Sequence, residues 1–187
     1  MQLFKTRFEI DSEEKQDLYS KIVHKHKFLL ENQYYNHSNN LNFSLTENQY
    51  NNFNNRLISF FIDSSREIFD DFEISSNGRC YAYVSNINEY HPKNRIHNHA
   101  KTCSVNSVYY LNVPSEQSGM ISFYDDSDKE VYVYQPETFD LLIMPNFVKH
   151  YPHRSLVEEY RVSINVEIHI KNWSDHYARW HKSNLTK

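Results

Sequence analysis

Apolar residues in the first third of the chain recur every three or four positions, which predicts two amphipathic helices. The first is expected to begin at residues 11–14, whose sequence D-S-E-E resembles a capping box, and to end near residue 32. The second is expected to begin near residue 46 and to end at residue 69. The apolar stripes consist of Leu18, Ile22, Phe28 and Leu29 in the first helix and of Tyr50, Phe53, Leu57, Phe61 and Ile68 in the second.

From residue 72 onward the pattern changes to short runs of aromatic and β-branched residues separated by turn-forming clusters. This change predicts a mostly β fold with N-terminal helices, in which the strands form an antiparallel sandwich or barrel. The expected strands are residues 80–84, 108–113, 120–124, 131–134, 138–144 and 160–170, and a last helix is expected at residues 172–181.

We therefore expect one domain that spans residues 1–187. Within it, residues 1–71 would form an N-terminal helical support and residues 72–170 the β-barrel core. Residues 171–187 would form a C-terminal helix and tail.

The composition excludes several classes of protein. The 187 residues include only two glycines, Gly78 and Gly119, so neither of the common glycine-rich phosphate loops can be present. A net charge of −4 provides no basic surface for nucleic acid or an anionic membrane, and no apolar run is long enough to span a bilayer. Cys80 and Cys103 lack zinc-finger spacing and are expected to be free thiols, which indicates the cytoplasm. The abundance of Asn, Lys and Ile resembles AT-rich phage or viral genomes, in which case the location is the host cytoplasm.

Three histidines form the strongest candidate site. His97 and His99 are two residues apart, so on a strand both imidazoles would project from one face. His150 follows a strand-like run after a short turn. Three protein ligands that leave other coordination positions free are typical of catalytic metal sites. Beyond them, the R-x-S of Arg161 and Ser163 could hold a dicarboxylic acid beside the metal, because a guanidinium matches a carboxylate.

The order of these motifs resembles the Fe(II)- and 2-oxoglutarate-dependent dioxygenases. Residues 108–112 (V-Y-Y-L-N) are similar to the Y-Y-L-N strand of prolyl hydroxylases, and residues 119–123 (G-M-I-S-F) to the family's G-x-x-x-F strand. Residues 141–150 resemble the strand that leads into the distal metal ligand. More narrowly, H-x-H followed by S-V-Y-Y-L and a late P-x-x-x-x-H resembles a group of 2-oxoglutarate oxygenases found in bacteria and phages. The resemblance covers about residues 80–170 and implies a double-stranded β-helix, which is a jelly-roll, cupin-like barrel.

The resemblance also implies an activity. It implies an oxidoreductase that holds Fe(II), uses 2-oxoglutarate as cosubstrate together with O2, and releases succinate and CO2 as it hydroxylates an unidentified substrate. That substrate would be a small molecule or a peptide side chain. The implied metal ligands are His97, His99 and His150.

The cosubstrate residues are implied in the same way. Arg161 would pair with the distal carboxylate of 2-oxoglutarate, and Ser163 and Tyr110 would contact the same group. Asn165 continues the row of Arg161 and Ser163 and is a candidate contact for substrate or cosubstrate. Tyr109, which points to the opposite face of its strand, is the reserve candidate for such a contact.

The sequence departs from the usual pattern at His99. Most of the superfamily has an acidic residue at this position, so a site of three histidines carries one more positive charge and also suits zinc. An alternative is that His99 is not a ligand and that Asp125 or Asp126 supplies a carboxylate.

Two other functions are compatible with the sequence. One is a cupin-like dioxygenase or hydrolase that uses a three-histidine metal without 2-oxoglutarate. The other is a non-catalytic barrel that serves as a binding module. The R-x-S motif favours the 2-oxoglutarate enzyme over the first, and bound metal would favour an enzyme over the second.

Overall fold

The computed structural model describes residues 3–32, 42–76, 79–89 and 96–184. The helices are α1 (Ser12–Glu31), α2 (Asn51–Phe69) and α3 (Trp173–Asn184), with short 3-10 turns at Asn48–Tyr50 and Glu116–Ser118. The carboxylate of Asp11 caps α1 by accepting a hydrogen bond from the backbone N–H of Glu14 at 2.8 Å. Within the described residues, no helix is both long and apolar enough to cross a membrane.

In the described part of the chain, ten strands form two antiparallel sheets. The large sheet has the order β1-β8-β5-β10-β4-β2, and β3 pairs with β10 beside this path; the small sheet has the order β7-β6-β9. The strands are β1 (Phe4–Arg7), β2 (Asn42–Ser44), β3 (Ile74–Ser76), β4 (Cys80–Ser85), β5 (Val105–Asn112), β6 (Ile121–Tyr124), β7 (Glu130–Tyr134), β8 (Asp140–Pro145), β9 (Lys149–Pro152) and β10 (Arg161–Ile170).

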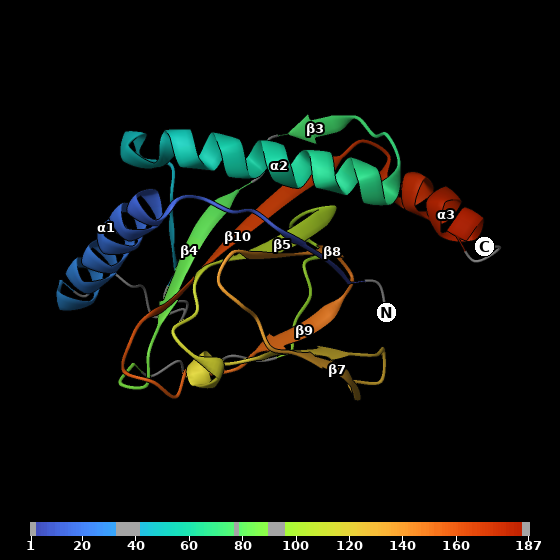
Figure 1. Ribbon diagram of the computed structural model, residues 1–187. Helices are drawn as coiled ribbons and strands as arrows, with labels where there is room; N and C mark the ends of the chain where they lie inside the picture. The colour runs from blue at the N-terminus through green and yellow to red at the C-terminus, as the bar shows by residue number, and fades with distance from the viewer. Residues whose placement is uncertain (1–2, 33–41, 77–78, 90–95, 185–187) are drawn as a thin grey trace.

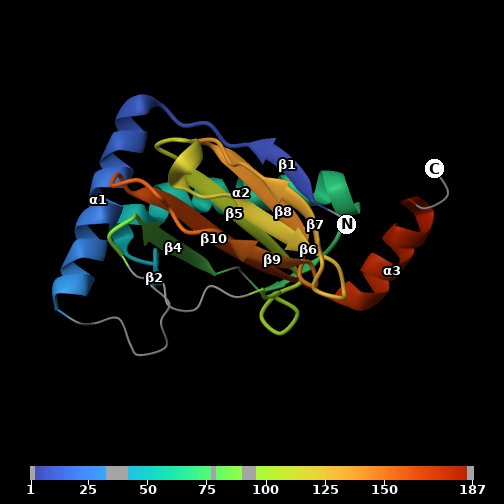
Figure 2. The same ribbon diagram turned by 90° about the horizontal axis from the view of Figure 1, so that it is seen from below.

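The large sheet is the central layer of the molecule. Helix α2 lies across its outer face, and strands β7 and β9 of the small sheet lie on the opposite side (Figure 1). Seen from below, the small sheet lies in front of β5, β8 and β10, with α1 at one end of the molecule and α3 near the other (Figure 2). The molecule therefore has a helical layer, a large sheet and a small sheet, and the space between the two sheets is separate from the helix-covered face.

Two apolar clusters fill these layers. The larger one lies between the helices and the outer face of the large sheet, and it contains α2 residues such as Phe61 and β10 residues such as Ile164. Helix α3 joins it through Trp180, whose ring centroid is 5.0 Å from that of Phe69. The smaller cluster belongs to the space between the sheets and contains Tyr110, Ile121, Phe123, Leu142, Met144 and Val148.

The predicted mostly β fold with antiparallel strands is confirmed, as are the two N-terminal helices and the C-terminal helix. The closed barrel is wrong, because no pairing of described strands joins the large sheet to the small one. The first third is also more than a helical support. Its strands β1 and β2 pair with β8 and β4, so this part of the chain supplies two edges of the large sheet.

Candidate metal centre

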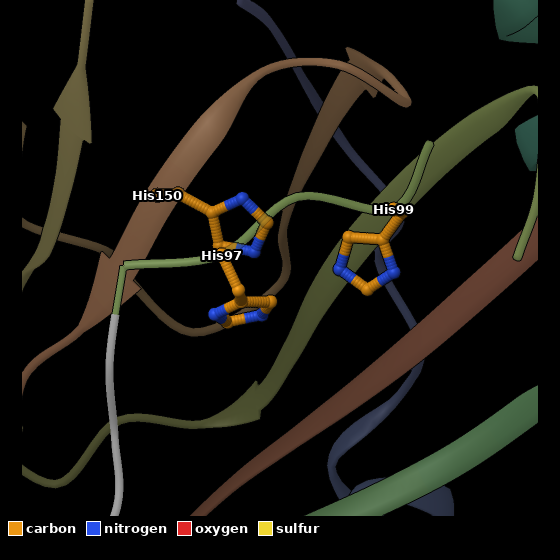
Figure 3. A group of neighbouring side chains, drawn as sticks. All are labelled: His97, His99 and His150. Carbon is orange, nitrogen blue, oxygen red and sulfur yellow. The ribbon is translucent and has the colours of Figure 1, made fainter. Parts of the chain in front are cut away.

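The three predicted histidines come together at the open side of strand β9. The backbone of His97 pairs with that of His150, with N–H to O distances of 3.0 and 2.9 Å. On the other side of β9, His150 lies opposite Phe123 of β6. The ring centroid of His150 is 4.4 Å from that of His97 and 5.3 Å from that of His99 (Figure 3). One ligand nitrogen from each of the three rings can be chosen so that all lie within 4.8 Å of one another.

The H-x-H pair does not reach this arrangement on a regular strand. His97 forms an isolated bridge, and His99 is held by a hydrogen bond from its own N–H to Asn146 O at 2.7 Å. The chain then turns, with Thr102 N–H donating to His99 O at 2.9 Å. Residues 97–99 therefore do not form the regular strand on which the H-x-H pair would project from one face, although the predicted convergence of the imidazoles is found.

His150 uses one ring nitrogen in a hydrogen bond, which leaves the other available to a metal. The Nδ1 atom of His150 is 3.1 Å from the carbonyl oxygen of Val148, which can only accept, so Nδ1 carries the proton and Nε2 keeps its lone pair. Burial, reinforced by His97 and His99, lowers the pKa of His150 to about 3. His150 is therefore neutral near pH 7, as metal coordination requires.

A residue that the sequence analysis did not identify contacts the trio. The Oε1 atom of Glu167, on β10, lies 2.9 Å from Nδ1 of His99. The hydroxyl of Thr102 donates to the same oxygen at 3.3 Å. Glu167 continues the every-second-residue row that contains Arg161, Ser163 and Asn165, and this periodicity is the signal that could have identified it.

The donor set and its surroundings fit a transition metal. Three imidazoles suit Fe(II) or Zn(II) and leave coordination positions for other ligands. Asn106 lies opposite Glu167 in the sheet register and is fully buried, yet neither its amide nitrogen nor its amide oxygen has a hydrogen-bond partner in the described structure. A buried amide of this kind normally has a partner, so a polar ligand or water is expected in the space beside it.

The alternative carboxylate ligands lie in the β6–β7 turn. The Oδ1 atom of Asp125 accepts hydrogen bonds from the backbone N–H groups of Ser127 and Lys129 at 2.9 and 3.0 Å, so it closes its own turn. Asp126 is exposed. Among the described residues, the candidate metal clusters include neither aspartate.

Arg161 lies at the opposite end of the polar row on β10. It is 7% exposed, and Nη1 donates to the carbonyl oxygen of Gly119 at 3.2 Å. It forms no ion pair with a carboxylate of the described residues. Burial lowers the pKa of Arg161, and the neighbouring Tyr110 acts in the opposite direction. A buried guanidinium without a carboxylate partner is costly unless an anion joins it.

The other predicted cosubstrate residues share this face of the sheet. Ser163 pairs with Tyr110 in the register of β10 and β5, and Tyr110 is buried in the cluster between the sheets. Burial raises the pKa of Tyr110, whereas the charge of Arg161 acts to lower it. Asn165, two positions beyond Ser163, is also buried. Phe123 belongs to the same cluster, and its ring centroid is 6.4 Å from that of His150, so this space extends to the histidines.

Tyr109 lies on the other face of the large sheet, which corrects its reserve assignment as a contact for substrate or cosubstrate. Its hydroxyl donates to the carbonyl oxygen of Phe8 at 3.1 Å, and its ring packs against Phe8 and Phe53. Successive residues of a strand face opposite sides, so Tyr110 reaches the space between the sheets and Tyr109 is part of the helix-side core.

No protein-family model matches the chain, and neither does any curated protein sequence. Solved structures do. A prolyl-4-hydroxylase from Pseudomonas putida is similar with a TM-score of 0.60 and 12% identity, over 89% of this chain and 91% of that one. The α-ketoglutarate-dependent carbocyclase SnoK from nogalamycin biosynthesis has a TM-score of 0.58 and 9% identity, over 90% and 79%. HygX from Streptomyces hygroscopicus, solved with nickel and 2-oxoglutarate bound, has a TM-score of 0.53 and 11% identity, over 88% and 80%.

At these identities the likeness shows the fold. The two antiparallel sheets are those of the jelly roll seen in 2-oxoglutarate oxygenases, so the predicted double-stranded β-helix is confirmed apart from closure into a barrel. The solved structures with this fold include prolyl 4-hydroxylases.

Proposed function

We propose that this protein is an Fe(II)- and 2-oxoglutarate-dependent dioxygenase that hydroxylates a small molecule or a peptide side chain. The observation that carries the proposal is Arg161, a buried guanidinium without a carboxylate partner among the described residues. It faces the same space between the sheets as Tyr110 and Ser163, and this space continues to the three histidines. A metal enzyme that binds its substrate directly has no need for such a guanidinium.

His97, His99 and His150 would hold the metal. A bound Fe(II) supplies the redox chemistry and the coordination positions for the 2-oxo acid and O2. In the overall reaction, 2-oxoglutarate, O2 and a C–H group give succinate, CO2 and the hydroxylated product, with one oxygen atom of O2 in succinate and the other in the product. Nickel and 2-oxoglutarate bound together to HygX support the same pair of ligands on this fold.

The chain's own residues would bind and orient the cosubstrate. Arg161 would donate two parallel hydrogen bonds to the distal carboxylate, and the hydroxyls of Tyr110 and Ser163 would donate further ones. Each hydrogen bond to a charged group contributes about 1.5–3 kcal/mol. Asn165 lies further along the same row, toward Glu167, and is our candidate contact for the substrate or for the 2-oxo acid. The buried walls of this space, which include Phe123 and Met144, would exclude water from the reaction.

The test is turnover of 2-oxoglutarate in the purified protein. After chelation and reloading with Fe(II), we expect succinate formation that requires both Fe(II) and O2, followed by NMR or mass spectrometry. His150→Ala should abolish it. Asp126→Asn, which changes an exposed carboxylate outside the cluster, is the matched control and should retain it. Iron-loaded protein that neither binds nor consumes 2-oxoglutarate would contradict the proposal.

A further inference from the structure

Glu167 is a buried carboxylate attached to one ligand of the candidate metal centre. It is 5% exposed, and Oε1 lies 2.9 Å from Nδ1 of His99. The hydroxyl of Thr102 donates to the same oxygen, which fixes the carboxylate from a second direction. Thr102 is itself tied to His99, because its backbone N–H donates to His99 O at 2.9 Å. The three side chains form one connected unit.

We propose that Glu167 is a positioning residue for His99 and sets the affinity of the three-histidine centre for its metal. This inference rests on the proposed metal site. A carboxylate can only accept from the ring, so Nδ1 of His99 carries the proton and Nε2 keeps the lone pair. The backbone of His99 lies outside any strand, whereas His150 belongs to β9 and His97 pairs with it through an isolated bridge, so we expect the side chain of His99 to depend most on this support.

Glu167 also supplies charge that the metal ligands lack. Three neutral imidazoles leave a divalent ion with its full charge of 2+, which is unfavourable in a partly buried site. A carboxylate hydrogen-bonded to a ligating histidine makes that ring a better donor and offsets part of the charge. Loss of such a partner typically weakens metal binding about 10- to 100-fold. Glu167 thus provides a negative charge that the neutral ligand His99 lacks, and it does so through its hydrogen bond to His99.

Two other roles for Glu167 have a structural basis and define the alternatives in the test. Glu167 could ligate the metal directly, in place of His99. It could also bind a second ion together with His99 and Cys103, whose ligand atoms lie within 4.8 Å of one another. We favour positioning, because Oε1 is engaged by His99 and Thr102, and the Cys103 thiol donates to His99 O.

The test measures metal binding itself, in the whole protein and without turnover. Co(II) is titrated anaerobically into apo protein, and the dissociation constant, the stoichiometry and the visible absorption bands are recorded. Glu167→Gln keeps a hydrogen-bond acceptor but removes the charge, whereas Glu167→Ala removes both. We expect about 10-fold weaker binding for the first and up to about 100-fold for the second, with one Co(II) per chain and unchanged absorption bands.

The controls separate positioning from folding and from ligation. Glu130→Gln removes an exposed carboxylate on β7 and should bind Co(II) as the wild type does. The melting temperatures of the apo proteins show whether a variant remains folded. His97→Ala provides the reference for loss of a ligand.

Three results would overturn the proposal. Wild-type affinity in both Glu167 variants would leave Glu167 with a packing role only. Altered absorption bands together with a loss as large as that of His97→Ala would make it a ligand. Two ions per wild-type chain, falling to one in Glu167→Gln, would indicate a second metal site. Failure of the proposed function is recognised separately, as wild-type protein that binds Co(II) but not 2-oxoglutarate.

Discussion

The two faces of strand β10 differ in polarity but not in burial. The helix-side face carries Val162, Ile164, Val166 and Ile168, and the face toward the small sheet carries Arg161, Ser163, Asn165 and Glu167. All eight residues are at least 90% buried. Apolar residues on the first face are explained by the core that they form, because each contributes about 1.5–3 kcal/mol on burial.

Core packing does not explain the polar residues on the face of β10 toward the small sheet. A buried polar group costs free energy unless it is hydrogen-bonded, and a buried charge costs more. Glu167 has His99 and Thr102, whereas Arg161 has a single backbone carbonyl. Stability does not explain a row of this kind that alternates with a normal core, and under the proposed function its residues serve ligand binding. Under the proposed function, one face of β10 therefore serves stability and the other face serves the chemistry.

The largest effect is expected from an acidic residue on the helix side. Ile164→Asp places an unpaired carboxylate in the fully buried core, so we expect a loss of more than about 4 kcal/mol and failure to fold at 37 °C. Urea unfolding followed by circular dichroism measures it. Ser163→Asp is the matched change one residue earlier, where the new carboxylate faces the same side as Arg161, and we expect it to fold. Equal stability of the two variants would refute the division between the faces.

Arg161→Leu should have the opposite effect to Ile164→Asp, because we expect it to lose 2-oxoglutarate binding and to keep its stability. Removing the guanidinium should weaken 2-oxoglutarate binding about 100- to 1,000-fold, since loss of a buried charged partner costs about 3–4 kcal/mol. Stability should remain unchanged or rise, because the replaced charge has no carboxylate partner among the described residues. Calorimetric titration of Zn(II)-loaded protein gives the affinity, and thermal unfolding gives the stability. A variant that loses stability but still binds 2-oxoglutarate would assign Arg161 to the fold.

Gly119→Ala is expected to lower both the stability of the fold and the affinity for 2-oxoglutarate, each by less than the preceding variants. Gly119 has φ of +101°, and an added Cβ would lie 2.6 Å from Nη1 of Arg161 and 2.6 Å from the carbonyl oxygen of His153. We expect a loss of about 1–3 kcal/mol, or roughly 2–12 °C in melting temperature, with weaker 2-oxoglutarate binding as Arg161 is displaced. Met120→Ala, at a half-exposed neighbour, should change neither. Normal cosubstrate binding in Gly119→Ala would show that Arg161 tolerates the displacement.

The sequence predicts the fold well where local periodicity decides it. The stripe along residues 51–69 and the alternation along 161–170 are long enough to define α2 and β10. Strands β1 and β2 have four and three residues, and they are strands only because β8 and β4 offer edges to pair with. Barrel closure likewise depends on hydrogen bonds between distant edges, about which a local pattern carries no information.

In the candidate site, too, local periodicity predicts some residues, whereas others come together only through the fold. The period of two places Arg161, Ser163 and Asn165 on one face, and the structure agrees. His97 and His99 converge for a different reason from the one predicted, since the segment pairs with His150 and then turns. The same period places Glu167 in this row, but its contact with His99 joins residues 68 positions apart, so the sequence could not show which residue Glu167 contacts.

The smallest effects, but the sharpest comparison, are expected from two neighbouring tyrosines of β5. Tyr109→Phe removes the hydrogen bond to Phe8 O on the helix side, so the free energy of unfolding should fall by about 1 kcal/mol, or roughly 2–4 °C in melting temperature. Its 2-oxoglutarate affinity should not change. Tyr110→Phe should weaken 2-oxoglutarate binding about tenfold and leave the melting temperature within about 2 °C, because Tyr110 lies in the cluster between the sheets, where its hydroxyl is proposed to contact the cosubstrate. Each variant is the control for the other. The two tyrosines are adjacent in β5 and differ in the face of the sheet that they occupy. If both variants lowered only the melting temperature, or both lowered only the 2-oxoglutarate affinity, the two faces of the large sheet would not be functionally separate.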